Sequence, residues 1–180
     1  MGELDYVLGI VAGEGCFTVG HKIQNGHIYI NPAFLISLKK KDADTLEVVK
    51  NVFDGRGSIS VNGDMATWRI SGKDNFKFIT KTIRENASDA WWKSEKAKNF
   101  KLWAEIIDIY TDGYNNSDDT AEMFRIAEDL NKGNGKEVDF TEKVKIAEND
   151  SYGHTCGYIK SDGEPCQRRV PVKDETCWDH

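Results

Sequence analysis

A single carboxylate at the end of a small apolar segment is the first candidate for chemistry in this chain. The segment from Val7 to Phe17 is apolar and rich in small residues, and Glu14 lies in it between Gly13 and Gly15. If the segment begins as a helix, Glu14 lies at the C-terminus of that helix, where the helix dipole disfavours a negative charge. A bound cation explains a carboxylate at such a place better than stability does. Taken alone, these residues also fit a buried helix with a solvated end.

Small residues form one face of the same predicted helix. Gly9, Ala12 and Gly13 fall at positions i, i+3 and i+4, which share a face of an α-helix. A face without bulky side chains lets a second helix approach closely, backbone against backbone. We therefore expect this face to contact another helix.

The C-terminal tail holds a second set of residues that could do chemistry. Three thiols and an imidazole, which make a complete tetrahedral zinc set, occur there as Cys156, Cys166, Cys177 and His180. His154 is a substitute ligand, and Arg168 and Arg169 could add phosphate contacts. A tail with few large apolar residues has no core unless a metal supplies one. The alternative is a disordered tail with reduced thiols, since the spacings are longer than those of standard zinc fingers.

Composition and charge indicate a globular chain with an uneven charge distribution. The chain has 180 residues, of which 39% are hydrophobic and 30% charged. No apolar run is long enough to cross a membrane and no secretory signal is evident, so we expect an intracellular protein. The net charge is −6, but residues 1–103 hold 15 Lys and Arg against 12 Asp and Glu. A local basic face, more than the total charge, attracts phosphate groups.

Periodicity and turn signals predict an α+β fold. Segments with apolar residues at helical spacing take turns along the chain with segments in which polar and apolar residues alternate. Each predicted pair of strands contains an Asn-Gly turn signal. The predicted helices cover 4–13, 43–53, 73–85, 91–110 and 120–130, and the predicted strands cover 16–23, 27–38, 58–61 and 66–71. This order favours two antiparallel hairpins with helices on one face over a parallel sheet. We expect a main domain over 1–143, a linker over 144–153 and a zinc-binding module over 154–180.

These motifs together resemble the LAGLIDADG homing endonucleases. The resemblance rests on the run from Gly13 to Phe17, the two hairpins, and the pattern Lys96-x-x-Asn99-Phe100-x-x-Trp103. The run Ala121-Glu122-Met123 and the later Asp129-Leu130-Asn131 look like the final helix of the family. The family's name string corresponds here to residues 7–15, and the resemblance covers residues 4–135.

The resemblance implies an enzyme with a particular site. One motif per chain implies a homodimer through Gly9, Ala12 and Gly13, in which Glu14 and the Gly13 carbonyl ligate Mg²⁺ or Mn²⁺. The implied reaction is cleavage of both DNA strands at a long, partly palindromic site, with no membrane and no small-molecule cofactor involved. The implied catalytic lysine is Lys96, with Lys93 as the second choice. Many relatives carry a Gln near the end of the second strand, close to the metal site, where a polar side chain can position water. This chain has Leu38 at the matching position, so the water-positioning role would pass to Ser37 or Lys39.

The resemblance also assigns DNA binding to the sheet face opposite the helices. Polar and cationic side chains of both hairpins should contact base edges and phosphates there: Thr18, Lys22, Gln24, Tyr29, Asn31, Ser37, Ser58, Ser60, Asn62, Thr67 and Arg69. Lys39, with Lys40 and Lys41, should contact the phosphate backbone. An ordinary solvated antiparallel face shows the same alternation of polar and apolar residues.

The alternative function within this fold is nucleic-acid binding without cleavage, as in RNA-splicing maturases or transcription regulators. Glu14 and Lys96 favour the enzyme, whereas Leu38 favours the alternative. A self-splicing intein is disfavoured, because the chain has no Cys or Ser at its start and no His-Asn pair at its end.

Overall fold

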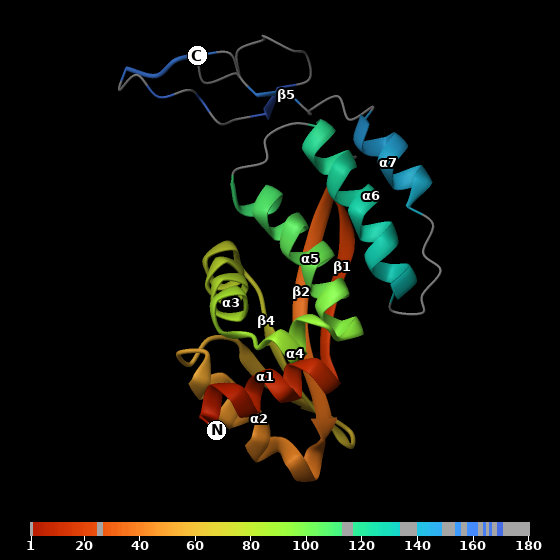
Figure 1. Cartoon of the computed structure of the whole chain (residues 1–180). Coiled ribbons are helices and arrows are strands. Elements are labelled where there is room, and N and C mark those ends of the chain that lie inside the picture. The colour runs from red at the N-terminus through yellow and green to blue at the C-terminus, as the bar shows by residue number, and fades with distance from the viewer. Residues whose placement is uncertain are drawn as a thin grey trace.

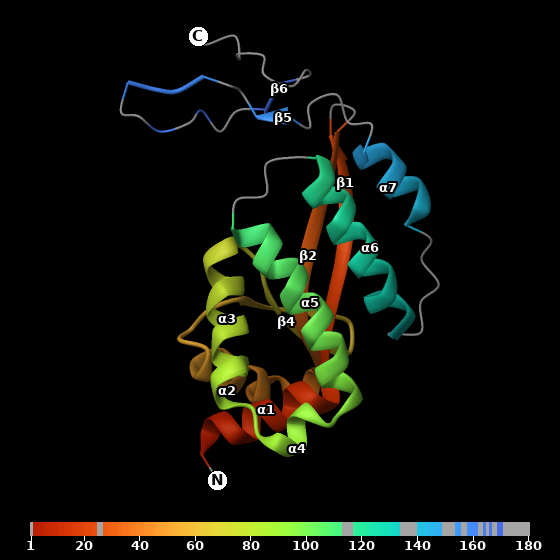
Figure 2. The same cartoon turned by 45° about the horizontal axis from the view of Figure 1, so that its top comes forward.

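The computed structural model describes residues 2–24, 27–112, 117–133, 140–148, 154–155, 158–161, 164, 166 and 169–170. An antiparallel four-stranded sheet with the order β1-β2-β4-β3 forms one layer. Helices cover one face of this sheet, with α5 crossing the long β1–β2 hairpin, as Figures 1 and 2 show. The predicted α+β architecture is confirmed, including the alternation of one helix with two strands.

The strands and helices follow the predicted order closely. The strands of the main sheet are β1 (Gly15–Gln24), β2 (His27–Lys39), β3 (Ser58–Asn62) and β4 (Met65–Ile70). The helices are α1 (Glu3–Glu14), η1 (Lys40–Asp42), α2 (Ala43–Val52), α3 (Lys73–Asn86), α4 (Asp89–Trp92), α5 (Glu95–Thr111), α6 (Ser117–Gly133) and α7 (Thr141–Glu148). Two short strands, β5 (His154–Thr155) and β6 (Arg169–Val170), pair with each other in the C-terminal tail.

Helix α1 forms because its N-terminus is capped and one of its faces is buried. The Asp5 carboxylate accepts a hydrogen bond from the backbone N–H of Gly2 (3.0 Å), and acidic groups in a first turn suit the helix dipole. The apolar side of the helix packs into the core through Val7, Leu8 and Val11. The opposite side of α1 is left exposed.

Helix α1 passes into strand β1 without a loop. Gly15 adopts an extended conformation while its N–H still donates to the Val11 carbonyl. A Cβ atom at Gly15 would lie 2.5 Å from the Val11 carbonyl oxygen, so only glycine fits this junction. Glu14, the last residue of α1, is thereby fixed at the point where the helix meets the sheet.

An aromatic cluster joins the sheet to α5. Phe17 of β1 stacks on Phe34 of β2 at a ring-centroid distance of 4.5 Å. Trp68 of β4 lies 5.5 Å from Phe34, and Trp103 of α5 lies 5.3 Å from Phe17. All four rings are buried, so they contribute much of the apolar contact that fixes α5 against the strands.

The helix predicted over 91–110 is wrong in one respect, because the structure divides it. Helix α4 ends at Trp92 and α5 begins at Glu95. The Ser94 hydroxyl accepts a hydrogen bond from the Ala97 N–H (3.2 Å) and also donates to the Trp91 carbonyl (2.7 Å). Ser94 therefore caps a new helix, a local preference that the apolar periodicity conceals.

The last described helix, α7, packs against α6. Phe140 precedes α7 and is buried, with its ring 5.4 Å from that of Phe124 in α6. Residues 144–148, the first half of the predicted linker, belong to α7, and Val144 packs against the core. Residues 149–153 lie outside the described part of the chain. Among the described helices, none combines the length and the apolar character needed to span a bilayer.

Candidate functional site

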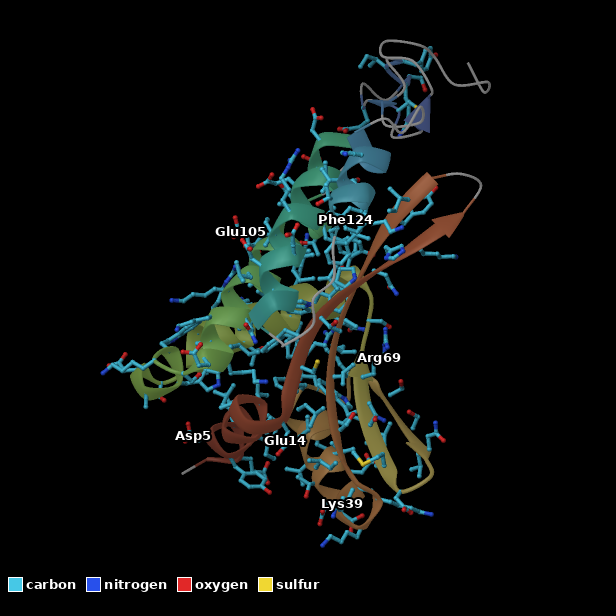
Figure 3. All side chains as sticks on the ribbon, turned by 90° about the vertical axis from the view of Figure 1, so that its right-hand side faces the viewer. Asp5, Glu14, Lys39, Arg69, Glu105 and Phe124 are labelled. Carbon is cyan, nitrogen blue, oxygen red and sulfur yellow. The ribbon has the colours of Figure 1, made fainter. Side chains whose placement is uncertain are left out.

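The end of α1 presents a carboxylate to solvent beside the sheet. Glu14 and Gly13 are both exposed. Figure 3 shows Glu14 where α1 meets the strands, with Lys39 and Arg69 on the sheet side and Glu105 on the outer side of the helical layer. The last carbonyls of a helix have no partner within the helix, so the Gly13 carbonyl is a second oxygen donor at this end. Hard oxygen donors of this kind suit a divalent cation such as Mg²⁺.

Lys96 is held against the backbone of the residue that follows Glu14. Its Nζ donates a hydrogen bond to the carbonyl of Gly15 at 2.5 Å, so the ammonium lies next to the residue that follows the carboxylate. Lys96 lies in the first turn of α5, which the Ser94 cap begins. The hydrogen bond spans 81 positions of the sequence, and no local pattern could have indicated it.

Lys93 is placed differently from Lys96. It follows α4 as the residue that closes that short helix, and its side chain is exposed. The sequence could not separate the two lysines, because they lie only three positions apart. In the structure, it is Lys96 whose ammonium contacts the junction of α1 and β1.

A hollow of about 530 Å³ opens between α1 and α2 beside Glu14. Its walls include the carboxylates of Asp5, Glu14 and Asp42 together with Leu38. Leu38 is half-buried and points to the helix-covered side of β2. The position where many relatives carry Gln is therefore apolar here and faces the same hollow as Glu14.

The small-residue face of α1 is uncovered in the single chain. Gly9 and Gly13 are exposed, and a Cβ atom at either would have no neighbouring atom within 4 Å. Ala12 is half-buried and lines a second groove, of about 490 Å³, on the other flank of the helix. This face has room for another helix, as its composition predicts.

Strand register places the predicted DNA-contacting residues on one face of the sheet. Residues directly opposite each other in antiparallel strands share a face, and alternate residues along a strand share it too. The predicted set forms one continuous surface through the pairs Lys22–Tyr29, Gly20–Asn31, Thr18–Ala33, Ser37–Thr67, Ser58–Arg69, Ser60–Thr67, Asn62–Met65 and Lys39–Met65. Of Gln24, only the backbone pairing with His27 is described. The buried Phe17, Phe34 and Trp68 have the opposite parity and face the helices. We call this surface the open face.

The open face contains polar groups, exposed cations and one residue that the sequence analysis did not assign to it. The hydroxyls of Ser37 and Thr67 hydrogen bond across β2 and β4 (2.8 Å). Lys22, Lys39 and Arg69 are exposed along the same surface. The predicted strand begins at Ala66, whereas β4 begins one residue earlier, at Met65. Its period-two spacing from Thr67 and Arg69 was the available signal.

The structure places only part of the predicted zinc set. Cys156, Cys177, His180 and Arg168 lie outside the described residues, and of the substitute ligand His154 only the backbone in β5 is described. Cys166 is described and is 4% exposed. Its N–H donates to the Tyr158 carbonyl, and the Lys160 N–H donates to the Glu164 carbonyl (both 2.9 Å), which closes a small hairpin. In the described part of the chain, no group of three or more His, Cys, Asp or Glu residues could hold a metal ion.

Comparison with known proteins agrees with this geometry. The family model described as LAGLIDADG endonuclease matches residues 7–107. No curated protein matches the chain. The match extends from the small-residue helix through both hairpins and into α5, so this chain belongs to the LAGLIDADG endonuclease family.

Solved structures share the fold at low sequence identity. The homing endonuclease I-TnaI is 23% identical, with a TM-score of 0.66 over 80% of this chain and 94% of that chain. The archaeal intron-encoded homing endonuclease I-Vdi141I, complexed with DNA, is 20% identical, with a TM-score of 0.71 over 81% and 94%. I-SmaMI bound to cleaved DNA is 19% identical, with a TM-score of 0.61 over 77% of this chain but 49% of that chain. The chain therefore corresponds in length to the first two proteins and to about half of the third.

Proposed function

We propose that this protein is a homodimeric, metal-dependent endonuclease that cuts both strands of a specific DNA site. The observation that carries the proposal is the contact of Lys96 with the Gly15 carbonyl. This contact brings the Lys96 ammonium to the residue that follows Glu14, whose carboxylate is exposed. Two proteins of the same fold have been solved in complex with DNA, I-Vdi141I and I-SmaMI, the latter with cleaved DNA, which supports DNA as the substrate.

The residues at the end of α1 fit a divalent cation. Glu14 and the Gly13 carbonyl offer hard oxygen donors in an exposed position, which suits Mg²⁺ or Mn²⁺. One protomer supplies only part of a coordination shell, so a second copy and the DNA phosphates would complete it. When bound, such an ion activates water and stabilises the charge that develops on the oxygens of the cleaved phosphodiester.

The role of α1 in the proposed dimer follows from its exposed face. If two copies meet through Gly9 and Gly13, a two-fold axis lies beside both helices and brings the two Glu14 carboxylates close together. Each carboxylate would then serve one DNA strand. The two open faces would form one continuous surface, and the bound site would be partly palindromic, because the protein surface is two-fold symmetric.

The other residues of the chain position the DNA and the reacting phosphate. The cations Lys22, Lys39 and Arg69 would neutralise phosphates, while the hydroxyl and amide groups between them would contact base edges in the major groove. Lys96, fixed by the Gly15 carbonyl, would hold a positive charge beside the phosphate that is cut. The Ser94 cap supports this placement because it begins α5 two residues earlier.

A zinc ion in the C-terminal tail is a separate part of the proposal. Cys166 is 4% exposed, and the Tyr158 and Ile159 side chains of the same hairpin are exposed. Thiolate ligation of zinc would explain a buried thiol of this kind. Cys156, Cys177 and His180 would complete the ligand set.

Leu38 favours the second candidate, a protein of this fold that binds nucleic acid without cutting it. An apolar side chain in the hollow beside Glu14 cannot orient water by hydrogen bonding. In the enzyme, that task would pass to Ser37 or Lys39. Both lie on the open face, so DNA rather than the hollow is their immediate neighbour.

The test replaces the carboxylate and keeps the shape of the side chain. Glu14→Gln should abolish Mg²⁺-dependent cleavage of a duplex selected from a random library and leave its affinity for that duplex within about two-fold. Glu47→Gln, an exposed substitution on α2, is the matched control and should cut like the wild type. A wild-type protein that binds its duplex but never nicks it in Mg²⁺ or Mn²⁺ would establish the second candidate instead.

A further inference from the structure

Two large apolar side chains lie exposed on the open face, within the described residues. Tyr29 is 41% exposed and Met65 is 43% exposed, whereas the neighbouring exposed positions of that face are polar or charged. Tyr29 carries a hydroxyl that can interact with water or phosphate. Met65 has no such group, and its presence on a polar surface is unexplained by packing, because Ala66, Trp68 and Ile70 of the same strand face the core.

The register fixes the surroundings of Met65. On the open face it lies between Lys39 of β2 and Asn62 of β3, so a cation and an amide flank the thioether. A lysine is suited to a phosphate and an asparagine to a base edge, and an apolar group between them would face the floor of the major groove. The apolar feature of that floor is the C5-methyl group of thymine.

The position of Met65 along the sheet places this contact near the centre of the DNA site. Lys39 is three residues beyond Ile36, which pairs with Gly15, the residue after Glu14. Three residues correspond to about 10 Å in the direction of the strands. Across the strands, Met65 of β4 lies two strand spacings, again about 10 Å, from β1. The diagonal distance from Gly15 to Met65 is therefore about 14 Å, which corresponds to about four base pairs at about 3.4 Å per step.

We propose that Met65 is a specificity-determining residue that contacts the methyl group of a thymine within about five base pairs of the cut, once in each half-site. This inference rests on the proposed DNA-binding function and adds a base preference to it. Met65 touches the base and takes no part in the reaction. Its flexible, polarisable side chain can adapt its shape to a methyl group.

The test compares thymine with deoxyuridine, which lacks only the C5-methyl group. Each thymine of the selected duplex is replaced in turn, in both half-sites, and the affinity of the wild-type protein is measured. Burial of one methyl-sized group changes an equilibrium by about four-fold, so the symmetric double replacement should weaken binding by about 15-fold at one inner position. Met65→Ala should abolish the preference for thymine at that position and leave the preferences elsewhere intact.

Two further variants separate a base contact from a change in structure. Met65→Leu should keep the preference for thymine, because it keeps an apolar side chain of similar volume. Val61→Ala is the matched control. Val61 lies on the neighbouring strand β3 and is 53% exposed, but its side chain is on the opposite face of the sheet, so this substitution should leave the preference for thymine unchanged. Because Met65 is exposed, its replacement should leave the midpoint of thermal unfolding nearly unchanged.

The possible failures point to different conclusions. Equal affinity for thymine and deoxyuridine at every inner position, or a preference that survives in Met65→Ala, would overturn the role of Met65 while leaving the proposed function standing. A selected site with no inner thymine would do the same. Failure to select or bind any specific duplex would overturn the proposed function and the role of Met65 together.

Discussion

Gly9 lies at the centre of the exposed face of α1, and its replacement by alanine should affect a single chain and a pair of chains in opposite directions. In the interior of a helix, alanine is more favourable than glycine by about 0.8–1 kcal/mol. A Cβ atom at Gly9 meets no atom within 4 Å in the single chain, so no clash offsets this gain. Gly9→Ala should therefore stabilise the isolated chain by about 1 kcal/mol.

In the proposed dimer the same methyl group would be added twice, at the closest approach of the two helices. Overpacking of a tight contact costs about 1–3 kcal/mol, which corresponds to roughly a 5- to 160-fold increase in the dissociation constant of the dimer. The rate of cleavage should decrease as the fraction of dimer decreases, because a monomer brings only one Glu14 to the DNA. The variant should thus combine a more stable chain with a weaker enzyme.

Two measurements separate these effects. Urea unfolding at a protein concentration below the dimer dissociation constant gives the stability of the chain, and sedimentation over a concentration series gives the dissociation constant. Asn51→Ala, at an exposed position of α2, is the control, because it also raises helix propensity but lies away from the face of Gly9. If Gly9→Ala raises stability and leaves the dissociation constant within two-fold of the wild type, the two chains do not meet through this face. If it lowers the stability of the monomer, the space around Gly9 is not open.

Three further results are expected. Lys96→Met should reduce the rate of cleavage by at least 100-fold in a single-turnover assay, because Lys96 is the lysine held by the Gly15 carbonyl. Lys93→Met should reduce the rate less than ten-fold, and equal losses would show that the two lysines do not differ in role. Cys166→Ser should lower the zinc content of the purified full chain from about one ion to well below one, by metal analysis, and an unchanged content would exclude this cysteine as a ligand. Glu14→Gln should raise the midpoint of thermal unfolding slightly, since it removes a negative charge from the C-terminus of α1; a lower midpoint would show that the carboxylate stabilises the fold.

The main domain was predictable because its signals are local. A small-residue helix that ends in a carboxylate, an Asn-Gly turn and strict alternation along four strands depend only on neighbours a few positions apart. For the same reason, the parity that puts Lys22, Ser37 and Arg69 on one face could be read along each strand separately. The division between α4 and α5 was missed, because the apolar spacing continues through Ser94 and the cap competes with it.

The contacts that distinguish one chemistry from another lie between distant parts of the chain. The sequence by itself determined the class of fold, the carboxylate at the end of α1 and which side of each strand is polar, because helix and strand periodicities are properties of short segments. Only the tertiary structure decided that Lys96 reaches Gly15 and that Lys39, Met65 and Asn62 form one row across three strands. Those arrangements depend on how buried aromatic side chains pack α5 and the two hairpins together, and that packing is fixed by the whole core at once.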